Sequence, residues 1–308
     1  MKHNVFAYWI FIRDCGGEAG AAVVARAYSS ARMAARIIVF ALVLLSTTDA
    51  LRGKGRGKSK GRGSGASTVA VSPPGEVECT KCMSAVMRLL IPHESRGCPG
   101  MPNGTVITST DLRRVPTAYC PTLLPKKRAC IAYSFGADGS SDFDNQMVAA
   151  TCRVLSFDPL CCGAAHRVGP SHDFIPIGLH WFDGLTDSDD PAHPNTTFPV
   201  LTLNTIKTSY EHPKVDVLRL KVATKHEWKV LKNLVNTGAL TDIFQVSLNL
   251  RMEDHDMWEE YRTILNGVRA AGFFPFYVKP QAGSTYLKVQ EGKHMLYSAY
   301  EVAYGNDS

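Results

Sequence analysis

Residues 129–159, which read ACIAYSFGADGSSDFDNQMVAATCRVLSFDP, decide the fold that this sequence predicts. An apolar strand ends at Gly136, a polar turn and a helix follow, and a second strand ends at Asp158. In such a β-α-β unit both strand ends lie at the same edge of a parallel sheet. An acidic residue about 20 residues past a glycine turn accepts hydrogen bonds from the hydroxyls of a nucleoside ribose. The stretch therefore predicts an α/β domain that binds a nucleoside-containing cofactor.

The glycine turn narrows the choice of cofactor. From Gly136 onward the sequence lacks the G-x-G-x-x-G pattern of dinucleotide-binding folds, so a pyrophosphate-binding turn is not indicated. A looser turn suits a cofactor without phosphates, such as S-adenosylmethionine. The expected cofactor-binding residues are Ser134, Phe135, Gly136, Asp138 and Asp158. The sequence predicts no metal ligand and identifies no catalytic residue.

Strands and helices alternate over the rest of the chain. The strand-like runs are 130–135, 154–157, 174–179, 215–221, 243–250, 273–278 and 295–304. The helix-like segments are 143–152, 203–210, 227–237 and 257–271. Asp256 is the expected N-cap of the last helix, and Gly238 and Gly272 are expected helix ends.

This alternation predicts a mostly parallel sheet that is covered on both faces. The last two strands have no helix between them, which is typical of S-adenosylmethionine-dependent methyltransferases. We therefore expect a Rossmann-like S-adenosylmethionine-dependent methyltransferase fold, with a mostly parallel seven-stranded sheet and a C-terminal antiparallel hairpin, over residues 120–308.

The N-terminal part predicts a targeting segment. Residues 37–45 are an unbroken apolar run after Arg32 and Arg36, with small residues behind it. The run is shorter than the ~20 residues that span a bilayer, so a secretory signal peptide is favoured over an anchor. We expect residues 1–50 to be a signal peptide or a membrane anchor, with Met33 as the true start. A targeting segment for another organelle is the alternative.

The net charge of +6 is concentrated in a linker. Residues 51–62 hold basic residues and no acid: Arg52, Lys54, Arg56, Lys58, Lys60 and Arg62. Because the rest of the chain is nearly neutral, no nucleic-acid partner is expected. Residues 51–76 predict a disordered basic linker. Contact of residues 51–62 with anionic glycans or lipid headgroups is an alternative to a solvated spacer.

The cysteines favour an oxidising compartment. Of nine cysteines, eight remain after Cys15 is removed with the leader: Cys79, Cys82, Cys98, Cys120, Cys130, Cys152, Cys161 and Cys162. An even count fits disulfides, whose pairing the sequence does not give. In the cysteine-bearing extension, residues 77–119, the pair Cys79 and Cys82 favours structural disulfides over a zinc or redox site. Glycosylation patterns begin at Asn103, Asn195 and Asn306. The expected location is the secretory pathway, either secreted or anchored in the Golgi or endoplasmic reticulum membrane.

A set of short motifs resembles the methyltransferase-like protein twenty-four family, which is distantly similar to the FkbM-type methyltransferases. These motifs are Tyr133-Ser134-Phe135-Gly136, Phe143-Asp144, Ser156-Phe157-Asp158-Pro159, Ile177-Gly178-Leu179, Val215-Asp216-Val217-Leu218, Glu227-Trp228-Lys229-Val230-Leu231 and Tyr300-Glu301-Val302. The resemblance runs from about Cys130 to the C-terminus. It implies a Rossmann-like methyltransferase that binds S-adenosylmethionine, with Gly136 and Asp158 at the matching cofactor positions, behind an N-terminal signal or anchor.

The chain departs from that family at the strand ends. Family members resemble Leu-Lys-x-Asp-x-Glu and Gln-Leu-x-x-Glu-x-His, where this sequence has Lys221, Ala223, Asn249 and Arg251. These changes remove candidate general bases and metal ligands and make the crevice floor more positive. Two hypotheses follow: a methyltransferase with an unknown acceptor, or a catalytically inactive binding or scaffolding protein. Another nucleotide-using enzyme, such as a glycosyl transferase, is disfavoured because a D-x-D metal pair is missing.

His180, Trp181 and Phe182 follow the third strand near the expected crevice, and His226 opens a helix. His180 and His226 are interpreted as structural or exposed rather than catalytic, because a lone histidine is more often so. Trp181 and Phe182 suit either the cover of an adenine or the core.

Overall fold

The structure is a computed structural model. It describes residues 76–92, 96–101, 103–107, 116–136, 142–161, 163–189, 192–221, 226–281, 283–284, 286–287 and 296–306. The chain divides into two units, Met1–Val71 and Ser72–Ser308, and all described residues belong to the second. Outside the described residues lie the predicted targeting segment with its start at Met33, nearly all of the basic linker, Asp138 and Ala223. No helix in the described ranges combines the length and apolar character of a membrane span.

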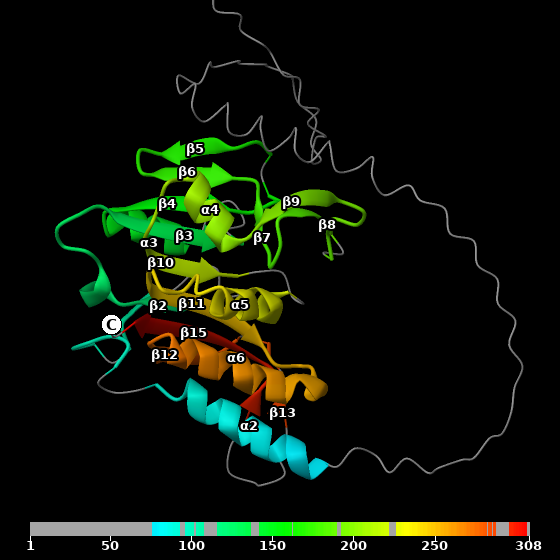
Figure 1. The fold of residues 1–308 in the computed structure, drawn as a ribbon. Helices are drawn as coiled ribbons and strands as arrows, with labels where there is room; N and C mark the ends of the chain where they lie inside the picture. The colour runs from blue at the N-terminus through cyan, green and yellow to red at the C-terminus, as the bar shows by residue number, and fades with distance from the viewer. Residues whose placement is uncertain are drawn as a thin grey trace, which may run out of the picture. The chain divides into compact units, whose positions relative to one another are not determined.

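The second unit is built on one large sheet (Figure 1). Its strands are β3 (Cys130–Phe135), β4 (Cys152–Phe157), β5 (His166–Gly169), β6 (His172–Ile175), β10 (Val215–Leu220), β11 (Ile243–Arg251), β12 (Phe273–Pro280) and β15 (Ala299–Asn306). Their order is β12-β15-β11-β10-β3-β4-β6-β5. From β6 to β11 all neighbours are parallel. β15 runs antiparallel to both β11 and β12.

This topology confirms the predicted fold class. β15 is the last strand in sequence and inserts in reverse between β11 and β12, as expected for a Rossmann-like methyltransferase sheet. The prediction of seven strands is one short, because β5 pairs antiparallel with β6 at the edge. β5 is mostly exposed, so it lacks the apolar run that marks a buried strand.

All four predicted helices are present, and a fifth precedes the sheet. They are α2 (Glu76–Leu90), α3 (Asp142–Ala149), α4 (Leu203–Ser209), α5 (Glu227–Asn236) and α6 (Trp258–Ala270). The described residues also include the 3-10 turns η2 (Pro121–Leu123) and η3 (His255–Met257). Gly238 and Gly272 follow their helices with φ of 67° and 91°, which confirms both as helix ends.

The predicted N-cap of α6 is wrong. The residue before α6 is Met257, which makes no side-chain capping bond. Asp254 starts the η3 turn instead, by accepting a hydrogen bond from the Asp256 amide. The inserted turn moves the start of α6 beyond Asp256.

The predicted strand 174–179 is two strands. β6 ends at Ile175, and β7 (Gly178–Leu179) belongs to a separate sheet of order β7-β9-β8, with β8 (Gly184–Asp187) and β9 (Thr197–Leu201). Pro176 lies at the break, where it cannot donate to the ladder. Two small antiparallel pairs complete the fold: β1 (Thr105–Ile107) with β2 (Thr117–Tyr119), and β13 (Tyr286–Leu287) with β14 (Leu296–Tyr297).

Both faces of the large sheet are buried, as expected for parallel strands. Along β3, Tyr133 and Phe135 join the larger core cluster on the side of α5 and α6. Cys130 and Ala132 join a second cluster with Phe143 of α3. Burial on both faces explains why these strands are rich in apolar residues in the sequence.

Disulfides connect distant parts of the chain. Cys98 pairs with Cys120, and Cys130 pairs with Cys152 across the register of β3 and β4. Cys161 is also disulfide-bonded. The disulfide prediction is wrong for Cys82, whose thiol donates a hydrogen bond to Glu259 at 3.3 Å.

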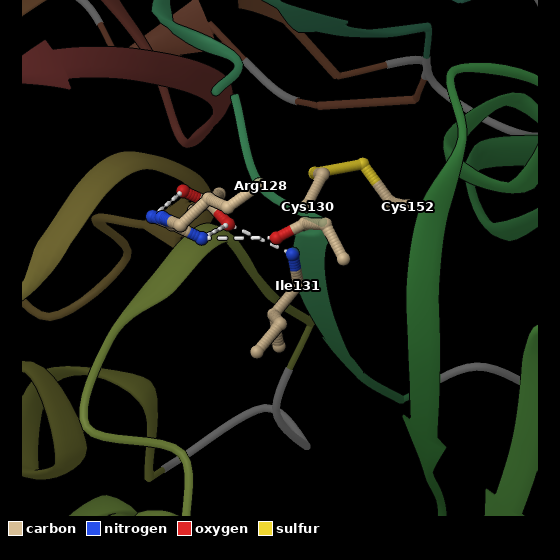
Figure 2. A network of polar contacts seen from close by, with 6 residues as sticks. Arg128, Cys130, Ile131 and Cys152 are labelled. Carbon is tan, nitrogen blue, oxygen red and sulfur yellow. Dashed lines mark hydrogen bonds and ion pairs between the residues drawn. A yellow bond between two sulfur atoms is a disulfide. The ribbon is translucent and has the colours of Figure 1, made fainter. Parts of the chain in front are cut away.

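An ion pair joins the amino ends of β3 and β10 beside the second disulfide (Figure 2). The Asp216 carboxylate accepts two bonds from Arg128, at 2.8 and 2.5 Å, and one from the Ile131 amide at 2.8 Å. Asp216 is fully buried. This part of the resemblance therefore marks a structural residue, at the opposite edge of the sheet from the predicted site.

Candidate cofactor crevice

Gly136 and Asp158 lie side by side at the carboxyl edge of the sheet. Phe135 of β3 is in register with Phe157 of β4, and the two site residues follow them directly. The Gly136 amide donates to the Phe157 carbonyl at 2.9 Å. The sequence prediction that these two positions meet at neighbouring strand ends is confirmed.

The strand order reverses at this place. From β3 the chain adds β4 and β6 on one side, then returns to add β10 and β11 on the other. In open α/β sheets ligands bind beyond the strand ends at such a switch point. Gly136 and Lys221, which follow β3 and β10, flank the switch point.

The backbone around Gly136 permits only glycine. Its φ is 74°, and a Cβ placed there would lie 2.0 Å from the Lys221 carbonyl oxygen. The Lys221 amide also donates to the Phe135 carbonyl at 3.1 Å. The two loop starts therefore pack backbone to backbone, and any side chain on residue 136 would force them apart.

Asp158 holds the turn after β4. Its Oδ1 accepts hydrogen bonds from the amides of Leu160, at 2.9 Å, and Cys161, at 3.2 Å. Its own amide donates to the Ile175 carbonyl of β6 at 3.1 Å. These bonds fix the carboxylate at the tip of the strand, half-buried.

The other predicted cofactor residues differ in what they can offer. The side chains of Ser134 and Phe135 are buried in the sheet, so only their backbone atoms are available at the strand end. The Ser134 hydroxyl also accepts a 3.4 Å hydrogen bond from Arg219. Asp138 lies outside the described residues.

The residues that depart from the family motifs lie on β11 and after β10. Lys221 is exposed. Asn249 accepts a hydrogen bond from the Gln281 amide group. Arg251 uses its backbone, donating to Glu227 and accepting from the Trp228 indole, each at 2.5 Å.

Glu301 of β15 is a buried acid that sequence reasoning missed as part of this site. It lies opposite Asn249 in the register of β11 and β15. Its Oε1 accepts from the Ser247 hydroxyl at 2.8 Å. Burial raises the pKa of Glu301, while the charges of Arg219 and Lys221 act to lower it. A buried acid therefore lies within electrostatic reach of Lys221 and Arg219, and burial opposes its ionisation while the two cations favour it.

Glu227 is a second buried acid, at the start of α5. Burial raises the pKa of Glu227 to about 8, against a smaller opposing effect of Arg251. A carboxyl group with this pKa is mostly neutral at pH 7. Its 2.5 Å bond to the Arg251 amide ties α5 to the end of β11.

An aromatic cluster surrounds His180 after β7. Its ring stacks on Trp181, with centroids 3.6 Å apart, and lies 5.3 Å from the His226 ring. His180 is 4% exposed, and neither ring nitrogen has a hydrogen-bond partner among the described residues. Burial lowers the pKa of His180 to about 4, aided by the charges of His226 and Lys229.

The contacts of Trp181 and Phe182 in this cluster show whether either residue suits the cover of an adenine ring. Lys229 lies over the Trp181 ring, 4.8 Å from its centroid, while His180 stacks on it. Trp181 is thus a packing residue, in line with the core interpretation. Phe182 is exposed and lies edge-on to His180 at 4.2 Å.

Comparisons with known proteins give only distant likenesses. A scan against models of protein families finds no match, and a search of curated proteins finds none. Among solved structures, Sp1610 of Streptococcus pneumoniae, assigned as a tRNA methyltransferase, is 10% identical with a TM-score of 0.27, covering 59% of this chain and 65% of that chain. This chain thus spans less than two thirds of that protein's length.

Two further solved structures are methyltransferases. The C-terminal domain of precorrin-6Y C5,15-methyltransferase from Rhodobacter capsulatus is 12% identical with a TM-score of 0.29, covering 70% of this chain and 96% of that domain. The antibiotic-resistance methyltransferase Kmr is 14% identical with a TM-score of 0.26, covering 66% of this chain and all of Kmr, 100%. With TM-scores this low, the fold assignment rests on the order and direction of the strands.

Proposed function

We propose that this chain binds S-adenosylmethionine and transfers its methyl group to an acceptor in the secretory pathway. The observation that carries the proposal is the meeting of Gly136 and Asp158 at the switch point of a sheet with a reversed last strand. The motif resemblance to the methyltransferase-like protein twenty-four family supports the same assignment. The acceptor is not specified by any described residue.

The residues at the switch point fit this cofactor. S-adenosylmethionine carries a ribose diol and no phosphate, which suits a strand-end carboxylate beside a turn without the dinucleotide pattern. A Cβ on residue 136 would clash with the Lys221 carbonyl oxygen, so glycine is what allows the loops after β3 and β10 to start side by side at the switch point. When bound, the cofactor supplies an electrophilic methyl group. The chain's own residues would bind the ribose through Asp158 and hold the acceptor in line.

The charge of the crevice is compatible with a sulfonium cation. Lys221 alone would disfavour a second positive charge nearby. Glu301 lies within electrostatic reach of both Lys221 and Arg219. Lys221 is exposed to solvent, where its charge is screened, whereas the acid is buried in the sheet.

The secretory part of the proposal rests on the cysteines. The described disulfides are buried and persist only where thiols are not kept reduced. An anchor before residue 51, or contact of residues 51–62 with anionic glycans or lipid headgroups, remains a proposal outside the described residues.

Calorimetry with S-adenosylmethionine tests the cofactor assignment. Asp158→Asn keeps an oxygen for the Leu160 and Cys161 amides but removes the charge, so folding should be retained. Affinity should fall about 10- to 100-fold, the value of a hydrogen bond to a charged group. Asp173→Asn, at a half-buried acid of β6 paired with Arg153, is the matched control and should bind normally. No binding by the wild type, or equal affinity of both variants, would contradict the assignment.

A catalytically inactive binding protein is the second candidate. It is favoured by Lys221, Asn249 and Arg251 at positions where the family has carboxylates and a histidine. A double variant, Lys221→Asp with Asn249→Glu, should then gain methyl transfer from radiolabelled S-adenosylmethionine on a panel of acceptors. Equal turnover of wild type and double variant would count against this candidate.

A further inference from the structure

The sequence carries three glycosylation patterns, and the structure shows that their asparagines differ in exposure to solvent. The first two lie in exposed turns, and the third begins in a buried strand. Attachment of a large hydrophilic glycan requires that the asparagine side chain project into solvent. The described surroundings of each asparagine therefore decide which pattern can be used.

Asn195 lies in the exposed connection between β8 and β9. Its φ is 60°, a left-handed conformation that asparagine adopts more readily than most residues. The residues after it, Thr196 and Thr197, are exposed as well. The turn is held by backbone bonds of Thr196 with Ser188 and His193, so the Asn195 side chain is not needed to close it.

Asn103 lies in a second exposed turn, before β1. The following residue, Gly104, packs so closely that a Cβ would lie 2.6 Å from the Tyr119 carbonyl oxygen. The turn is closed by the Gly104 amide, which donates to Met101 at 2.9 Å. The glycine thus packs inward while the asparagine remains at the surface.

Asn306 is in the opposite situation. It is 5% exposed, at the end of β15, and its side-chain amide donates to the Ile243 carbonyl at 3.4 Å. Its Oδ1 would lie 2.8 Å from a Cβ on Gly272. A glycan on this nitrogen would have to break the end of the strand away from Phe273, its register partner.

We propose that Asn195 and Asn103 carry N-linked glycans and that Asn306 does not. The proposal rests on the secretory part of the proposed function and not on cofactor binding. The side-chain nitrogen of each asparagine forms a bond to C1 of a lipid-linked oligosaccharide diphosphate. The bond from C1 to the diphosphate oxygen breaks, the lipid diphosphate leaves, and the amide proton passes to a base of the transferase.

A glycan on Asn195 would also protect a sheet edge. β8 is the outer strand of its sheet, and its Leu185 is 58% exposed opposite Pro199. Exposed edge strands with apolar side chains promote pairing between molecules. A hydrophilic glycan at the turn that joins β8 to β9 would shield this edge, whereas a glycan on Asn103 would not.

The test expresses the full chain in mammalian cells and measures site occupancy by mass spectrometry after enzymatic glycan release. Occupancy is expected at Asn195 and Asn103 and not at Asn306. Asn195→Gln and Asn103→Gln should each remove one glycan, and Asn195→Gln should aggregate more than Asn103→Gln. Thr197→Ser keeps the pattern and should keep the glycan. Ser308→Ala removes the third pattern without touching Asn306 and should change nothing.

The outcomes separate this inference from the proposed function. A chain recovered from the medium or the organelle lumen without glycans, or with a glycan on Asn306 alone, would overturn the inference and leave the compartment standing. A chain found only in the cytosol would overturn the compartment and the inference together. Calorimetry on the purified chain reports on cofactor binding in either case.

Discussion

Removal of the Asp216 carboxylate should be among the most destabilising single changes in this chain. Asp216→Ala leaves the buried Ile131 amide without its acceptor, at a cost of about 1–3 kcal/mol. It also removes the two charge-assisted bonds from Arg128 (Figure 2), which contribute about 2 kcal/mol net because that side chain is 41% exposed and regains water. We expect the free energy of unfolding to fall by about 3–5 kcal/mol.

Asp216→Asn separates the two contributions. The asparagine oxygen can still accept from the Ile131 amide while the charge is lost, so a smaller loss of about 1–3 kcal/mol is expected. Urea unfolding followed by tryptophan fluorescence gives these differences, provided that the slope with denaturant stays constant. Asp242→Ala, at a half-exposed acid 3.4 Å from Lys207, is the matched control and should cost less than about 1 kcal/mol. Equal losses for the two alanine variants would refute the reasoning.

Three further predictions concern the core and the crevice. Replacement of Cys130 and Cys152 by serine should lower the free energy of unfolding by about 3 kcal/mol, since the disulfide closes a loop of 22 residues. The disulfide of Cys98 and Cys120 closes a loop of the same length, so its replacement by serine should cost about the same. Losses that differ by more than half between the two variants would argue against loop closure as the cause. Because the pKa of His180 is about 4 in the folded chain, below its unfolded value, the contribution of His180 to stability should fall by up to about 3 kcal/mol as the pH drops from 6.5 to 4, measured in urea titrations as the change in the difference between wild type and His180→Phe. The pKa of Glu227 is raised to about 8, so the contribution of Glu227 should instead fall as the pH rises from about 4.5 through 8, measured as the change in the difference between wild type and Glu227→Gln over that range.

The sequence predicts the large sheet well because its strands are buried on both faces. The apolar residues that recur through β3, β10 and β11 predict strands of a covered sheet, and the helices between the strands show helical spacing. The sequence does not predict β5 and β8, because both strands are largely exposed and contain few apolar residues. The break after β6 had a signal, since Pro176 interrupts the predicted strand, but length and apolarity outweighed it.

The candidate site is likewise predicted only in part, namely where it depends on local sequence. The meeting of Gly136 and Asp158 follows from two consecutive parallel strands, so the local sequence contains it. Glu301 does not follow from local sequence, because its place opposite Asn249 depends on the register of two strands more than forty residues apart. The burial of Glu227 likewise depends on how α5 packs against the end of β11, which its position after Lys221 in the sequence does not reveal.

This division affects the choice between an enzyme and an inactive relative. In the sequence, residues 221, 223 and 249 are not the carboxylates of the family that the motifs resemble, and the crevice floor looks too positive for a sulfonium cation. In the folded chain, however, the buried Glu301 of β15 lies within electrostatic reach of Arg219 and Lys221. Burial favours its neutral form and the two cations favour its charged form, so a cation arriving beside it would favour ionisation further. Lys221 is exposed to solvent, whereas Glu301 is buried within the sheet. The substitutions therefore argue against a carboxylate base on β10 or β11 more strongly than they argue against cofactor binding.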